Sequence, residues 1–199
     1  MTTKEVILQK AIELFNKKGY AAVSMRDIAD AANKSVGNVT YHYKKKSDLI
    51  LAIVELQYED FKSLKLKSDA DIMDFNQQLK TMLQFQKKYY FYFSNIIQLR
   101  NSYYEILEFQ LKVQKILTAY FIQIIENFEK EGIFREVSDK ELYGFLAKGI
   151  VSLMMSWAQQ NSQEDMEKND ELLKIVWSIL YFNLTEKGIG LYNKIAVCD

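Results

Sequence analysis

The first apolar stripe of the chain falls at the spacing of one helix face. Leu8, Ala11, Ile12 and Phe15 recur three or four residues apart, as apolar residues do on a helix that covers a core. Gly19 follows them, and glycine is the residue that most readily ends a helix in a left-handed turn. The pattern therefore predicts a first helix that packs through this stripe and stops near Gly19.

A second helix is predicted to begin at Ser24. Asp27 stands three residues further on, so the two side chains can form a capping box at the helix start. The apolar residues that follow share one face of this short helix: Met25, Ile28, Ala29 and Ala32.

A third helix is predicted from Val36 to about residue 44, after a turn at Asn33. Ser35 can cap it, while Val39 and Tyr43 lie one turn apart and can face inward. The other side of the helix is polar and small. A short helix of this kind, with lysines beside it, suits the major groove of DNA.

Beyond residue 46 the pattern remains helical. The prediction is a linking helix over 47–64, a long aromatic helix over 72–99, one or two helices over 103–131, and two more over 138–160 and 169–187. The sequence contains no proline and only seven glycines, which favours long uninterrupted helices. The predicted fold is all-α, with a three-helix head over 1–46 joined to a larger helical body over 47–199.

Charge is unevenly divided between these two parts, although the chain as a whole is neutral. Residues 1–46 hold nine Lys or Arg and four Asp or Glu, a net charge of +5, so the remainder carries −5. A basic head on an acidic body fits a head that binds nucleic acid. Chance clustering on a solvated surface explains the charge equally well, so the motif carries the argument.

Three segments of the head resemble the tetracycline-repressor-like (TetR) family of regulators. They are LFNKKGY (14–20), SMRDIADAA (24–32) and SVGNVTYHYKKKSDL (35–49), and they stand in the order and spacing of that family. The resemblance implies a helix-turn-helix head that binds DNA. It also implies that the helical region beyond residue 50 serves dimerisation and ligand binding.

Within the head, different residues suit different DNA contacts. Asn38 can pair with a base edge, and Val36 can touch a thymine methyl. Lys46, at the start of the linking helix, can meet a phosphate with its amine and with the free backbone N–H groups. The candidate DNA-binding residues are Ser24, Arg26, Ser35, Val36, Gly37, Asn38, Thr40, Tyr41, His42, Lys44 and Lys46.

The aromatic run over 85–93 has two interpretations. It can be plain core, or it can form the wall of a small-molecule cavity, since such pockets are mostly apolar with a few placed polar groups. One helix face cannot bury all of these rings, which favours the cavity. Arg100 could pair with an acidic ligand or only offset a helix dipole. The candidate ligand-binding residues are Phe85, Tyr89, Phe93, Ile97, Arg100, Tyr103, Tyr104, Phe109, Tyr120 and Trp157.

The last two predicted helices carry apolar stripes that could meet a second copy of the chain. Such stripes more often face their own core, but the family resemblance favours a four-helix dimer interface. The candidate interface residues are Leu142, Leu146, Gly149, Leu153, Leu173, Val176, Trp177, Leu180 and Leu184.

Other chemistry has little support in the sequence. His42 is the only histidine and Cys198 the only cysteine, so no metal cluster, catalytic triad or internal disulfide is expected. The chain shows no phosphate-binding glycine loop, and its longest charge-free run, 149–163, is too short to span a membrane. No cofactor is expected, and the cytoplasm is the expected compartment.

The preferred interpretation is a ligand-responsive, homodimeric transcriptional regulator, most simply a repressor released from a palindromic operator by an apolar or aromatic effector. A helical protein–protein adaptor that keeps the head fold without binding an operator is the alternative. A helical enzyme is a third, which the missing acid–base constellation disfavours.

Overall fold

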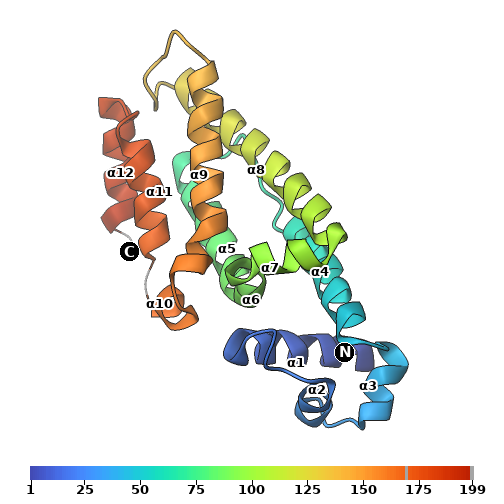
Figure 1. Cartoon of the computed structure of the whole chain (residues 1–199). Helices are drawn as coiled ribbons and strands as arrows, with labels where there is room; N and C mark the ends of the chain where they lie inside the picture. Colours follow the sequence, from blue (N-terminus) through green and yellow to red (C-terminus); the bar gives the residue numbers. More distant parts are fainter. Residues whose placement is uncertain (169, 198–199) are drawn as a thin grey trace.

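The computed structural model describes residues 1–168 and 170–197, which form twelve α-helices (Figure 1). Among these residues, extended pairing is limited to one isolated bridge between Phe134 and Leu184, so the all-α prediction is confirmed. The helices are α1 Thr3–Lys18, α2 Met25–Ala31, α3 Val36–His42, α4 Lys46–Ser63, α5 Ile72–Lys88, α6 Tyr90–Ser94, α7 Ile96–Ser102, α8 Tyr104–Lys130, α9 Glu141–Gln160, α10 Gln163–Lys168, α11 Glu171–Tyr181 and α12 Glu186–Val197.

The head consists of α1, α2 and α3. Both α1 and α2 begin at a capping box, and the one at Ser24 was predicted. The Glu5 N–H donates to Thr2 Oγ1 at 3.3 Å, and the Asp27 N–H donates to Ser24 Oγ at 3.2 Å. In both boxes the acidic side chain also accepts from the backbone N–H of the capping residue. These bonds satisfy helix-end donors that would otherwise lack partners, so they define where α1 and α2 begin.

The helix α4 joins head to body without a flexible linker. It begins at Lys46, one residue earlier than predicted, and the Asp48 carboxylate accepts from the Lys45 N–H at 3.0 Å. Leu49, Ile50 and Ile53 are fully buried in the core of the head. Further along the same helix, Phe61 is buried in the core of the body. Movement of the body can therefore reach the head through one rigid element.

The prediction of a single helix over 72–99 is wrong, because the helix is interrupted at two residues. Tyr89 adopts φ −110° and ψ 33°, and Asn95 adopts φ −115° and ψ 17°, which separates α5, α6 and α7. The break explains how Tyr89, Phe91, Tyr92 and Phe93 are all buried. Phe91, Tyr92 and Phe93 lie on the short helix α6, which packs against α1, α5, α7 and α9, so neighbours on several sides cover its rings.

The C-terminal part also differs from the prediction. The segment over 161–169, predicted as a loop, contains α10. The last predicted helix, over 169–187, ends earlier, as α11 at Tyr181, and a further helix, α12, covers Glu186–Val197. Asn169, the predicted cap of the helix over 169–187, and Cys198 lie outside the described residues. None of the helices in the described part of the chain combines the length and apolarity that a bilayer crossing requires.

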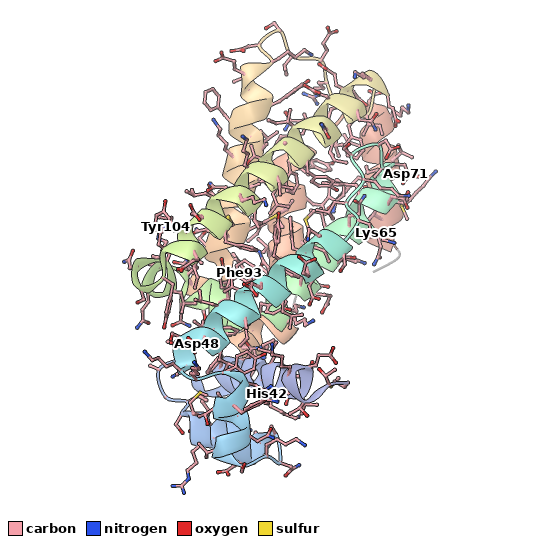
Figure 2. The ribbon with its side chains drawn as sticks, turned by 90° about the vertical axis from the view of Figure 1, so that its right-hand side faces the viewer. His42, Asp48, Lys65, Asp71, Phe93 and Tyr104 are labelled. Carbon is pink, nitrogen blue, oxygen red and sulfur yellow. The ribbon has the colours of Figure 1, made fainter. Side chains whose placement is uncertain are left out.

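The helices are arranged as a small head beneath a tall body (Figure 1). In the body, α8 and α9 pack along each other, and α11 and α12 cover α5 from the other side. Two hydrophobic cores result. The upper one lies within the body, and the lower one continues from the head into α6, α7 and the start of α8. Figure 2 shows His42 in the head, at the opposite end of the molecule from Asp71.

Candidate DNA-binding face and ligand cavity

The short helix α3 is held from the inside by two side chains. Val39 is fully buried and Tyr43 is 5% exposed, as predicted. The Asn38 N–H donates to Ser35 Oγ at 3.1 Å, which caps the start of the helix. With its orientation set by these contacts, α3 presents its opposite side to solvent.

Most of the predicted DNA-contact residues are exposed, on α3 or on the neighbouring parts of the head. Tyr41 is 82% exposed and Val36 is 40% exposed. Three predicted residues are only partly exposed: Thr40, His42 and Lys46. The exposed ones are Ser24, Arg26, Ser35, Val36, Gly37, Asn38, Tyr41 and Lys44.

Gly37 has no role in the packing of the head that would require a glycine. A Cβ built at this position would meet only Ser35 Oγ, at 3.9 Å, which is ordinary contact, and its φ lies outside the left-handed region. A glycine inside a helix is unfavourable by about 1 kcal/mol relative to alanine. A close approach by another molecule at the outer face would explain why this position carries no side chain.

Thr40 does not offer its hydroxyl proton to the outside. Thr40 Oγ1 donates to the Val36 carbonyl at 3.0 Å and lies 3.2 Å from the Gly37 carbonyl oxygen. Tyr41 and His42 pack edge to face with ring centres 5.2 Å apart. In this conformation Tyr41 is therefore the more accessible donor of the three.

Lys46 does not present its amine to the DNA-binding face, which corrects the phosphate contact predicted for that group. Its Nζ donates to the Tyr20 carbonyl and lies 4.2 Å from the centre of the Tyr20 ring. The ring of Phe15 lies 5.7 Å away on the same side. Burial lowers the pKa of this ammonium. The amine instead ties the start of α4 to the end of α1, because carbonyls and aromatic faces there attract it.

The body holds two adjoining cavities between α4, α5, α6, α8 and α9. They have volumes of about 30 and 20 Å³, and five apolar side chains line both: Phe61, Phe85, Phe93, Val113 and Met155. A single water needs about 10–15 Å³ by this measure, and a benzene-sized cavity is several times larger. In this conformation the space is therefore closed, and an organic ligand must push its walls apart.

The predicted ligand residues are only partly gathered at these cavities. Phe85, Phe93 and Phe109 line them. Trp157 instead lines a separate cavity of about 10 Å³ beside Leu83 and Met166.

The remaining predicted ligand residues line neither cavity. Ile97 is 52% exposed, and Tyr104, which is labelled in Figure 2, is 68% exposed. Arg100 is partly exposed near the end of α7, and Tyr120 is buried in the upper core. These residues correct the prediction, since aromatic content alone does not show which way a helix face turns.

Two tyrosines that were predicted to contact ligand instead make polar contacts inside the protein. The Tyr89 hydroxyl donates to Asp60 Oδ2 at 2.7 Å, and Lys88 pairs with the same carboxylate. Burial and the hydrogen bond to Asp60 raise the pKa of Tyr89. Tyr103 shares a hydrogen bond of 2.8 Å with Tyr20 and so connects body to head.

Sequence reasoning missed three glutamines at the cavities. Gln57 and Gln110 line the smaller cavity and Gln86 lines the larger one. Gln57 is 3% exposed and Gln86 is 5% exposed. Their positions among the apolar residues of α4 and α5 were a usable signal, because glutamine on a core-facing stripe is uncommon.

The predicted dimer residues divide between the two helices. Those on α11 and just after it fill the protein's own core, so the prediction is wrong for them: Leu173, Val176, Trp177, Leu180 and Leu184. Trp177 even donates to Asn76 Oδ1 at 2.8 Å inside that core. On α9, Leu142 and Gly149 are exposed, whereas Leu146 and Leu153 are partly buried.

The geometry defines a helix-turn-helix protein: a three-helix head with an exposed polar helix, continuous with a helical body. The family model described as "Bacterial regulatory proteins, tetR family" matches residues 7–53, and the model described as "Bacterial transcriptional repressor" matches residues 57–188. The chain therefore belongs to the tetR family of bacterial transcriptional regulators.

Individual relatives agree with this assignment. The probable HTH-type transcriptional regulator YttP of Bacillus subtilis is 29% identical, over 80% of this chain and 79% of the relative. The HTH-type transcriptional regulator QacR of Staphylococcus aureus is 31% identical, over 66% of this chain and 71% of the relative. A tetR-family regulator from Marinobacter aquaeolei VT8 shares the fold, with a TM-score of 0.85, 21% identity and 98% of both chains covered.

Proposed function

We propose that this protein is a homodimeric repressor that is released from a palindromic operator by a small, largely apolar effector. The observation that carries the proposal is the outer side of α3. It keeps exposed hydrogen-bonding groups such as Asn38 and Tyr41, and a glycine at position 37 that the fold itself does not require. Their exposure and grouping support insertion of α3 into a major groove, with Asn38 on a base edge.

The outer face of α9 supports assembly of two chains. Leu142 is 50% exposed and Phe145 is 62% exposed, and Gly149 follows Phe145 by one turn. A Cβ at Gly149 would meet nothing within 4 Å, so the monomer gives no packing reason for this glycine. Phe182, at the end of α11, is 80% exposed. Large exposed rings beside a bare helix backbone are typical of a face that a partner helix covers.

The cavities provide the physical link from effector to DNA. Gln57 and Phe61 belong to α4, and Phe93 belongs to α6. The start of α4 is buried in the core of the head, and the Phe91 ring on α6 lies 5.2 Å from the Phe15 ring on α1. A ligand that enlarges the cavities must displace α4 or α6, and either displacement changes the distance between the two α3 helices of a dimer.

Selection of bound duplexes from random DNA, with the full-length protein, tests this function. The expected result is a palindromic sequence whose half-sites are separated by about one helical turn of 34 Å, or a multiple of it. Two results together would contradict a regulator that binds an operator and would favour an adaptor. The selected duplexes would share no sequence, and no duplex would be bound in a salt-sensitive manner.

A further inference from the structure

The residues around the two cavities combine apolar side chains with buried amide oxygens that lack partners. The Oε1 atoms of Gln57, Gln86 and Gln110 are all buried and have no hydrogen-bond partner within the protein. A buried acceptor without a partner is unfavourable, and most buried polar groups in native proteins are paired. Three such acceptors around one pair of cavities indicate a molecule that supplies the missing donors.

Gln86 determines which kind of group is missing. Its Nε2 donates to the Met154 carbonyl at 2.8 Å. A carbonyl oxygen can only accept, so this bond assigns the nitrogen and leaves Oε1 as the group without a partner. The amide of Gln86, a residue that lines the larger cavity, therefore lacks a donor at its oxygen, and turning the amide over would break the existing bond.

Gln57 adds a second buried amide oxygen without a partner, on a residue that lines the smaller cavity. It lies one helical turn before Phe61 on α4 and is 97% buried, being 3% exposed. Gln110 faces the same cavity from α8. The two cavities share Phe93 and Met155 as walls, so one molecule that separates these side chains could reach all three amides. Met155 is well suited to yield, because its side chain is flexible.

The walls of both cavities carry no ionised group. The side chains that line them are aliphatic, aromatic, thioether and amide, without an Asp, Glu, Lys or Arg among the described residues. Tyr92, which lines the smaller cavity, is a neutral phenol because burial raises its pKa. An ion entering this space would lose its hydration without gaining a counter-charge, which disfavours charged ligands.

We infer that the effector is an uncharged, mostly apolar molecule that carries hydrogen-bond donors, such as a phenol, an alcohol or an amide, and that Gln86 and Gln57 accept from them. This inference rests on the proposed function, because it describes the ligand of the same body cavities. It narrows the effector to neutral donors and excludes organic cations, carboxylic acids in their ionised form and molecules that only accept.

A set of matched ring compounds tests the inference with the full-length protein. The probes are 4-ethylphenol and 4-ethylaniline as neutral donors, 4-ethylanisole as a neutral acceptor, 4-ethylbenzoate as an anion and 4-ethylbenzylammonium as a cation. Titration calorimetry should show the phenol and the aniline binding about tenfold or more tightly than the anisole, as a satisfied buried acceptor implies. Equal binding of phenol and anisole, preference for either ion, or no detectable binding of any probe up to its solubility would overturn the inference.

Variants connect the preference to the named amides. Gln86→Leu should weaken binding of 4-ethylphenol about tenfold without weakening that of 4-ethylanisole. Gln84→Leu, on the exposed side of the same helix, is the matched control and should change neither affinity. Gln57→Leu provides the same comparison on α4 if Gln86→Leu does not fold. An unchanged phenol preference in a folded variant at position 86, or failing that at position 57, would contradict the assignment.

Operator binding, measured without any probe, separates this inference from the proposed function. If the wild-type protein shows no sequence-specific binding to DNA, the proposed function as an operator-binding repressor is contradicted. Operator binding that stays intact while an anion or cation is the preferred probe would leave a DNA-binding regulator and overturn only the assignment of the ligand.

Discussion

Asn16 on α1 accepts a hydrogen bond of 2.9 Å from the backbone N–H of Phe91 on α6. The same amide donates through Nδ2 to the Lys88 carbonyl, also at 2.9 Å. One side chain of the head thus satisfies the donor and the acceptor left open where the helix breaks at Tyr89. The break that defeats a single-helix prediction is also the place where the body holds the head.

Replacing Asn16 by Ala should loosen the head from the body. Two hydrogen bonds are lost, and the free energy of unfolding should fall by about 1–3 kcal/mol. Hydrogen exchange should show weaker protection at the Phe91 N–H than in the wild type. Asn101→Ala, at an exposed position, is the control. Unchanged protection at Phe91 would show that ring packing between Phe15 and Phe91 holds the head by itself.

Asn38 and Lys44 should differ in how their loss affects DNA binding. Asn38→Ala should relax the preference at one base pair of each half-site, by about 1–3 kcal/mol, with the salt slope unchanged. Lys44→Ala should weaken binding to every sequence alike and reduce the salt slope by about one. Titrations on operator variants at several salt concentrations distinguish the two. Uniform weakening by both substitutions would make Asn38 a backbone contact.

Lys46→Ala should act on stability rather than on the salt slope. The ammonium contacts the Tyr20 carbonyl and ring, and a cation–π contact contributes about 0.5–2 kcal/mol. Thermal unfolding should show a lower melting temperature for this variant, whereas Lys45→Ala, at an exposed neighbouring position, should leave it nearly unchanged. If Lys46→Ala keeps wild-type stability but lowers the salt slope by about one, the amine turns outward to a phosphate when DNA is bound.

Gly37→Ala should have opposite effects on folding and on binding. The new Cβ has room, and alanine favours a helix by about 1 kcal/mol over glycine, so the free energy of unfolding should rise. Operator affinity should fall, because the methyl group occupies the space where DNA would approach. Chemical denaturation and operator titration are the two measurements. Unchanged affinity would place the DNA surface further from Gly37.

Phe145→Asp should convert the protein to a monomer. A charge in the middle of the proposed α9 interface would be buried without a partner on assembly. Sedimentation at micromolar concentration should show half the mass of the wild type, and helical content by circular dichroism should be preserved. Tyr104→Asp, at another exposed ring, should remain dimeric. A Phe145→Asp protein that still sediments as a dimer would move the interface away from α9.

Local signals in the sequence were sufficient for the head. Ser24 with Asp27, the apolar pair Val39 and Tyr43, and the glycine at position 19 each act on neighbours within a few residues. Capping bonds and helix periodicity depend only on such short spacings, so the sequence by itself determined the three helices and the outward side of α3. Gly19 indeed adopts a positive φ of 79° at the end of α1.

Only the tertiary structure decided the functions of the body residues. Leu173 and Phe145 are both apolar residues on amphipathic helices, yet one is buried in the core and the other is exposed. Which stripe faces inward depends on how α5, α9 and α11 pack, and that involves contacts between residues far apart in the sequence. For the same reason, Gln57 and Gln86 could be recognised as cavity residues only from the packing of α4, α5 and α9. An acceptor is known to lack a partner only when the positions of all the groups around it are known.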